Sequence, residues 1–392
     1  MLKSLPIGNI KPTHLIYIVL FAIFILGFFV LPTDRSLHRV FIYGILIPFI
    51  FIARDVWTHT SLFRHPLFYC MVAYLLFACI SSFWTTSEFV ISNFDWDKPL
   101  KRSVYILVFC LAVAWVNIKA PEVFQALLTA LIAVAAVVAF LGIAFWWVRF
   151  GGDFSERLWG ITRAEHAIQG AASFAVIFLL SLIRYIESRT LLKKIAYVLA
   201  ASLCLLFVLL AQTRGVLIAV CVAALIIFIL KRNFKPLIIL GLVAVIVLCL
   251  SYFWVDWSTL GNGLTRNMPY RLEMWKITLL QSLQVPWLGH GFIHDPRVTV
   301  EGITFPHAHN IYVSTFFLTG LVGLALYGLM VLCSLYYAYL NRFDDRYLFA
   351  GVTIVFASIA MLSDIGKVIM GPTDLWFYFW FPMGIILSTP HR

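Results

Sequence analysis

The chain has 392 residues, of which 62% are hydrophobic and 12% are charged, and its formal net charge is +11. A soluble domain carries roughly 25% charged residues, so this chain has too few charges to cover a water-exposed surface. The composition excludes a soluble globular enzyme, a disordered chain and a fibrous protein, and it predicts a protein that crosses a membrane several times.

Charge-free segments divide the chain along its whole length. A helix needs about 20 apolar residues to cross the hydrocarbon core of a bilayer, whereas barrel strands would alternate apolar and polar residues. Because the apolar runs are long and continuous, we predict an all-α polytopic membrane protein with about 12 transmembrane helices. The segments without Lys, Arg, Asp or Glu are 12–33, 40–53, 65–87, 103–118, 123–148, 166–183, 195–213, 215–230, 236–255, 302–341, 347–363 and 375–391.

The basic residues predict which side of the membrane each loop faces. Short cytoplasmic loops of membrane proteins are rich in Lys and Arg, and RTLLKK at 189–194 and KRNFK at 231–235 are two such loops. We therefore expect both termini in the cytoplasm. Three larger loops, at about 83–100, 149–165 and 255–308, then lie outside.

The last of these loops has an organisation of its own. We treat 1–392 as a single transmembrane domain and 255–308 as a loop subdomain within it. Residues 270–284 predict an amphipathic helix lying at the membrane interface, and PWLGHGF at 286–292 predicts a turn. The apolar positions at helical spacing are Leu272, Trp275, Leu279 and Leu283.

Arginine predominates over lysine in or beside the outer segments of the second half. Arg grips phosphate with two parallel hydrogen bonds, which Lys cannot do, so the pattern indicates a site for a phosphate-bearing ligand on the outer face. For each arginine an ordinary interfacial role is the alternative. Arg214 is the strongest candidate, because it lies in a tight polar corner between two apolar runs, where a charge is costly. The arginines are Arg149, Arg157, Arg163, Arg214, Arg266, Arg271 and Arg297.

A second group of polar residues, His307, His309 and Asn310, precedes a long apolar run. Asn310 suits the start of a helix, and the positive end of that helix favours a neutral His309. A neutral imidazole can act as a general base, although a histidine that only caps the helix is the alternative. The two histidines are two positions apart and would diverge, and no metal-ligand spacing occurs nearby, so we expect no metal.

A third patch, RLWGITRAEHAIQG at 157–170, ends an outer loop and opens a span. Its residues Arg163, Glu165 and His166 can face the same cavity, and a charged interfacial rim is the alternative. The chain contains no P-loop and no GxGxxG motif, so we expect no nucleotide cofactor and no other cofactor.

Four stretches in chain order resemble the O-antigen ligase and O-antigen polymerase superfamily of bacterial envelope assembly. They are RLWG with the following EH, the corner Thr213–Gly215, RLEMW with PWLGHGF, and HAHNIYV with TGLVGL, and they cover about 157–325. The predicted number of spans also agrees with the family's twelve. The resemblance implies the fold of the all-helical membrane glycosyltransferases.

The resemblance also implies an activity at the periplasmic face of the bacterial inner membrane. Ligases of this family transfer an O-antigen glycan from undecaprenyl pyrophosphate to lipid A-core oligosaccharide, without a metal and with inversion. Arg214 and Arg271, with Arg163 third, would bind the leaving pyrophosphate, and His309 would be the base. The expected partners are that donor, that acceptor and membrane lipids, with no nucleic acid. The other predicted substrate-binding residues are Arg157, His307 and Asn310.

Two other functions remain open. A polymerase of the same superfamily would use a second lipid-linked glycan as acceptor, and the HAHN motif, the single long outer loop and the modest length favour the ligase. A flippase or exporter of lipid-linked glycans would need polar residues along its inner cavity, whereas the apolar runs of this chain are free of charges.

Overall fold

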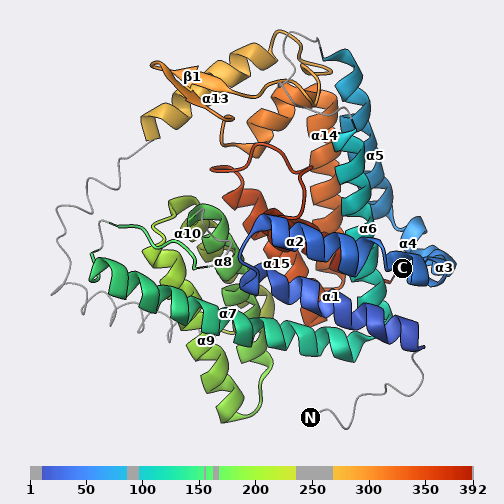
Figure 1. Ribbon diagram of the computed structural model, residues 1–392, viewed down its shortest axis with the longest axis vertical. Helices are drawn as coiled ribbons and strands as arrows, with labels where there is room; N and C mark the ends of the chain where they lie inside the picture. Colours follow the sequence, from blue (N-terminus) through green and yellow to red (C-terminus); the bar gives the residue numbers. More distant parts are fainter. Residues whose placement is uncertain (1–10, 86–96, 154–155, 162–166, 235–267, 391–392) are drawn as a thin grey trace.

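The computed structural model describes residues 11–85, 97–153, 156–161, 167–234 and 268–390, and most of them are helical (Figure 1). The helices are α1 (Pro12–Val30), α2 (Asp34–Phe41), α3 (Phe49–Thr58), α4 (Thr60–Arg64), α5 (Pro66–Ser81), α6 (Lys98–Lys119), α7 (Pro121–Phe150), α8 (Ala167–Glu187), α9 (Leu191–Leu210), α10 (Arg214–Lys231), α13 (Met268–Ser282), α14 (Ile311–Leu340), α15 (Asp345–Ala360) and α16 (Phe381–Leu387). Three shorter helices are η3 (Ile42–Leu46), η4 (Ser82–Trp84) and η6 (Trp376–Trp380).

The prediction of an all-α protein with several membrane spans is confirmed. Within the described residues, eight helices are long and apolar enough to cross a membrane, and a bent pair, Asp34–Leu46 with Phe49–Thr58, gives a ninth. The predicted segments 347–363 and 375–391 correspond to the shorter helix α15 and to the pair η6 and α16. The segment 236–255 lies outside the described residues, so the total of about 12 spans stays a prediction.

The centre of the molecule is formed by helices with small or aromatic residues. The first two turns of α8 contain the buried residues Gly170, Ala171 and Ala172, small residues of the kind that let neighbouring backbones approach closely in helical membrane proteins. The ring of Trp376 lies 5.0 Å from Phe41 and 4.9 Å from Phe109, measured between centroids. The segment 361–375, which joins α15 to η6, lies near the middle of the view in Figure 1, enclosed by helices.

Helix α14 is interrupted at Gly320, whose backbone has φ 65° and ψ −168°. The predicted turn after α13 is confirmed, and it lies against this interruption. The amides of Leu321 and Val322 donate to the carbonyls of Pro286 (2.8 Å) and Trp287 (3.2 Å). In return, the amide of His290 donates to the carbonyl of Phe317 at 2.9 Å. The turn therefore satisfies backbone groups that a broken helix in an apolar environment would leave unpaired.

The outer segment also contains a small hairpin, which the sequence analysis did not predict. Strands β1 (Val298–Val300) and β2 (Ile303–Phe305) are antiparallel, with Val298 opposite Phe305. The hairpin and α13 share a small apolar core formed by Met274, Val298 and Val300. This core lies apart from the main core of the helices, although the assignment of 255–308 as a subdomain stays a prediction.

The helix predicted over 270–284 is confirmed as α13. Its buried residues are Met274, Thr278 and Ser282, whereas the predicted apolar stripe is mostly exposed, with Leu272 at 60% and Leu283 at 62% of their accessible surface. The stripe thus faces away from the protein, as it must if the helix lies on lipid. Its location at the membrane interface stays a prediction.

Candidate functional site

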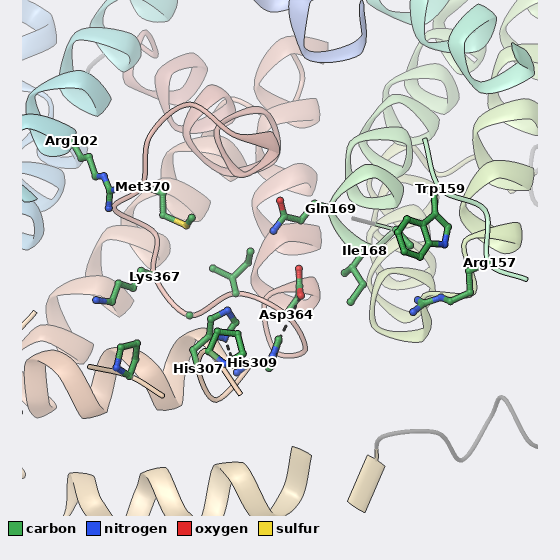
Figure 2. A pocket seen from close by; sticks show the side chains of 15 residues that line it. Arg102, Arg157, Trp159, Ile168, Gln169, His307, His309, Asp364, Lys367 and Met370 are labelled. Atoms are coloured by element: carbon green, nitrogen blue, oxygen red, sulfur yellow. Dashed lines mark hydrogen bonds and ion pairs between the residues drawn. The ribbon is translucent and has the colours of Figure 1, made fainter. Parts of the chain in front are cut away.

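A cavity of about 520 Å³ lies where the segments around 157–159, 167–169, 306–309 and 364–370 meet α6. Figure 2 shows His307, His309 and Asp364 in the middle of this cavity. Arg157 lies at one end, and Arg102 and Lys367 lie at the other. The cavity therefore combines a histidine pair and a carboxylate with cations on both sides.

His309 and Asp364 form the centre of the site. His309 Nδ1 lies 3.8 Å from Asp364 Oδ1, which is longer than a hydrogen bond, and both side chains are largely buried. In the part of the chain that the structure describes, this buried Nδ1 atom has no hydrogen-bond partner. His309 also has φ 51°, a left-handed conformation that is rare for residues other than Gly and that clusters at functional sites. The arrangement leaves Nε2 of His309 as the ring atom directed away from the carboxylate.

His307 supports the conformation of His309. The backbone amide of His309 donates to Nδ1 of His307 at 3.0 Å, so a neutral His307 carries its proton on Nε2. Burial, helped by the nearby His309 and Lys367 and opposed by Asp364, lowers the pKa of His307 to about 4. His307 is therefore uncharged at neutral pH. Gly366 leaves room for this ring, because a Cβ atom there would lie 2.6 Å from Cγ of His307.

The corner at Thr213–Gly215 meets the stretch that begins at Arg157. Arg157 Nε donates to the carbonyl of Ala211 at 3.1 Å, and Nη2 donates to that of Gln212 at 3.4 Å. A Cβ atom on Gly215 would lie 2.1 Å from Oγ of Ser363, so the corner packs directly against the residue before Asp364. The stretch that begins at Arg157, the corner before α10 and the segment around Ser363 are far apart in the sequence and thus lie side by side in the structure.

Arg214 and Arg271 lie beside this junction. Arg214 is the first residue of α10, where the helix terminus itself favours an anion. Burial lowers the pKa of Arg271, the charge of Arg214 lowers it further, and the carboxylate of Asp364 raises it. A buried Arg271 beside the charge of Arg214 and a helix N-terminus is suited to bind a phosphate-bearing group, whose negative charge would offset the repulsion between the two guanidinium groups.

Comparison with known proteins shows what this chain is similar to. A family model described as O-antigen ligase matches residues 199–328. A curated O-antigen ligase from Pseudomonas aeruginosa is 26% identical over 332 residues, which are 82% of this chain and 77% of that relative. The resemblance to the O-antigen ligases is confirmed.

The O-antigen ligase family match runs from α9 into α14, so it contains Arg214, Arg271 and the histidine pair. It does not contain Arg157 or Asp364, which reach the same site through the fold.

Asn310 and Arg163 are the two other residues predicted for the site. The start of α14 is confirmed: Asn310 Oδ1 caps the helix by accepting from the amides of Tyr312 (3.0 Å) and Val313 (3.3 Å). Because this oxygen accepts from two backbone amides, the structure supports a role for Asn310 in fixing the start of α14 directly after His309. A contact of Asn310 with substrate stays a prediction. Arg163, with its neighbours Glu165 and His166, lies outside the described residues.

The structure also adds residues that the sequence analysis did not single out, above all Asp364 and Lys367. Both are charged and lie in a short segment between two apolar runs, the same kind of position that drew attention to Arg214. Weighing every charged residue at an apolar corner would have found them. Three or more His, Cys, Asp or Glu side chains placed to hold a metal occur nowhere in 11–85, 97–153, 156–161, 167–234 or 268–390.

Proposed function

We propose that this protein is a membrane glycosyltransferase that transfers an O-antigen glycan from undecaprenyl pyrophosphate to lipid A-core oligosaccharide. The observation that carries the proposal is the pairing of His309 with Asp364 beside Arg157, Arg214 and Arg271, in a chain similar to O-antigen ligases. By the predicted topology, this reaction takes place at the periplasmic face of the bacterial inner membrane.

The arginines would bind the leaving group. When the bond between the anomeric carbon and the pyrophosphate oxygen breaks, its electron pair goes to the pyrophosphate, whose negative charge increases. Fixed positive donors that are already in place stabilise such developing charge without reorganisation. Arg214 at the start of α10 and Arg271 on α13 supply two forked donors, and Arg157 contributes a third cation from the cavity wall.

His309 would act as the general base. The acceptor hydroxyl forms the new bond to the anomeric carbon and loses its proton to Nε2 of His309. Asp364, 3.8 Å from Nδ1, then stabilises the imidazolium and fixes the orientation of the ring. Attack opposite the leaving group inverts the anomeric centre. We infer a metal-independent reaction, because arginine side chains stand where a metal would otherwise neutralise the pyrophosphate.

Reconstitution tests this function directly. The purified protein in proteoliposomes is given an undecaprenyl-pyrophosphate glycan with either lipid A-core or a second lipid-linked glycan, with and without EDTA. We expect the glycan on lipid A-core at an unchanged rate in EDTA. If the glycan is transferred only to the second lipid-linked glycan, the protein is a polymerase and the proposed ligase function is wrong. Translocation of the donor with no new glycosidic bond would favour a flippase and contradict a transferase.

A further inference from the structure

The end of the cavity opposite Arg157 has no role in the steps described above, although it is also cationic. Lys367 and Arg102 lie there, the first from the segment between α15 and η6 and the second from α6 (Figure 2). Each belongs to the wall of the same cavity as His309. The site therefore has a second positive end, which we call the Lys367 end.

Lys367 is held in a defined position. Its ammonium donates to the carbonyl of Phe292 at 2.9 Å and lies 5.0 Å from the centre of the Phe292 ring. Phe292 is itself fixed, because its amide donates to Oγ of Ser81 at 3.2 Å. Gly291 (φ 98°) brings the backbone so close to the residue after η4 that a Cβ atom would lie 1.9 Å from Oγ1 of Thr85. The ammonium is thus preorganised for binding.

The electrostatics of the Lys367 end favour an anion. Burial, helped by the charge of Arg102 and opposed by Asp295, lowers the pKa of Lys367 to about 8. Asp295 already pairs with Arg297, whose Nε donates to it at 2.7 Å. A phosphate or carboxylate would therefore offset the cost of holding two neighbouring cations in a partly buried place.

The direction of the reaction identifies the molecule that would carry this anion. This step rests on the proposed function, in which the pyrophosphate binds near Arg157, Arg214 and Arg271. An inverting displacement brings the acceptor hydroxyl in from the side opposite the leaving group. With His309 in the middle of the cavity, the acceptor then extends toward the Lys367 end.

We propose that Lys367 and Arg102 bind an anionic substituent, a phosphate monoester or a carboxylate, on the sugars of the acceptor glycolipid. The two cations thereby place the acceptor so that its hydroxyl meets His309. This is a positioning role, distinct from the binding of the donor.

The test combines variants with modified acceptors. Lys367→Met removes the charge and keeps an apolar side chain of similar length beside Phe292, and Lys367→Arg restores a cation. The control is Lys101→Met, which removes an exposed charge from the neighbouring position of α6. Initial rates of the reconstituted protein are measured against the concentrations of donor and of lipid A-core, the latter intact or with its phosphate monoesters removed enzymatically. Lipid A-core whose carboxyl groups have been reduced serves as the corresponding acceptor, which tests whether the recognised anion is a carboxylate.

We expect Lys367→Met to raise KM for the intact acceptor about tenfold or more, the size expected for a lost charge-assisted hydrogen bond. KM for the donor stays unchanged, Lys367→Arg restores much of the affinity, and Lys101→Met has little effect. Removing the recognised anion from the acceptor raises KM for the unmodified protein and abolishes the difference between that protein and Lys367→Met.

Three results would overturn the inference. The first is that the unmodified protein has equal KM values for all acceptors. The second is that the tenfold rise in acceptor KM of Lys367→Met persists with both modified acceptors, and the third is that Lys367→Met changes KM for the donor alone. If the unmodified protein transfers to no form of lipid A-core, the proposed function fails and this inference fails with it. Transfer by the unmodified protein together with any of the three results would contradict the inference alone.

Discussion

His309 has one defined task in the proposed reaction, so the effect of losing it can be estimated. General-base catalysis contributes about 10²–10⁴-fold to rate, and we expect His309→Ala to lower the transfer rate by about that factor. Within the part of the chain that the structure describes, the His309 side chain donates no hydrogen bond that joins helices, so the variant should still fold. The measurement is the initial rate in proteoliposomes, with elution in size-exclusion chromatography as the check on folding. His59→Ala, at the end of α3, is the control, and a normal rate in His309→Ala would remove this residue from the mechanism.

Arg214 tests whether the phosphate contact is bidentate. Lys keeps the charge but loses the planar fork of donors, so Arg214→Lys should lower the rate more than about tenfold and raise KM for the donor. Arg149→Lys is the matched control, because Arg149 is an exposed residue at the end of α7. If Lys at 214 supports the same rate and donor KM as Arg, the bidentate contact is wrong.

The charge of Lys367 should make binding of the acceptor depend on pH. Its pKa of about 8 means that the positive charge is present at lower pH and is lost as pH rises through that value. The charged or titratable groups around it are Arg102 on α6, Asp295 and His294 before β1, and His307 before α14. We therefore expect KM for the acceptor to rise between about pH 7 and about pH 9. Lys367→Arg should remove this rise, because Arg stays charged throughout; an identical rise in that variant would assign it to another group.

Local sequence signals predicted some of these residues and missed others for a physical reason. Arg214 and His309 could be predicted because each lies at a boundary between polar and apolar residues, which a single window of sequence reveals. Asp364 also lies at such a boundary, but its pairing with His309 could not be predicted, since α14 and α15 separate the two residues in the sequence. Only the packing of these helices brings the two side chains together.

Among the elements, the start of α14 could be predicted from local sequence, whereas its interruption could not. Asn310 predicts the start because capping is local. The interruption at Gly320 depends on the turn after α13, which precedes it by many residues, and the uncharged run at 302–341 gives no sign of it. The three-residue strands β1 and β2 are likewise too short to show a strand pattern.

The interruption of α14 gives a prediction about stability. A Cβ atom on Gly320 would lie 2.3 Å from the carbonyl oxygen of Trp287, and its φ of 65° is unfavourable for other residues. Gly320→Ala should therefore destabilise the protein by at least about 1–2 kcal/mol and lower the apparent Tm in detergent micelles by several degrees.

Gly328, in the same helix, is the matched control, because nothing lies within 4 Å of the position that its Cβ would occupy. Gly328→Ala should leave the Tm unchanged or raise it slightly, since Ala favours a helix by up to about 1 kcal/mol. Equal Tm values for the two variants would mean that the turn after α13 does not hold the interruption of α14 in place.

In the molecule as a whole, one cluster of charged residues lies apart from the cavity of the proposed site. Lys231 at the end of α10 pairs with Glu187 of α8 and with Asp345 at the start of α15 (2.8 Å). Lys231 belongs to one of the two loops that we expect in the cytoplasm, and Glu187 lies just before the other, at 189–194; the structure brings both to the start of α15. The site residues Arg157, Arg271 and His307 come from loops that we expect on the other side. A common location of each set is what an alternating path through a membrane requires.

The orientation itself can be tested by labelling single cysteines in cells whose outer membrane has been permeabilised. Thr299→Cys introduces an exposed thiol on β1, and Lys193→Cys introduces one near the start of α9. If the site faces the periplasm, a membrane-impermeant maleimide should label position 299 in whole cells and position 193 only after lysis. The unmodified chain is the control, because its seven cysteines all lie within apolar runs. The reverse pattern would place the arginines and His309 in the cytoplasm, away from any periplasmic acceptor, and would contradict the proposed function together with the orientation.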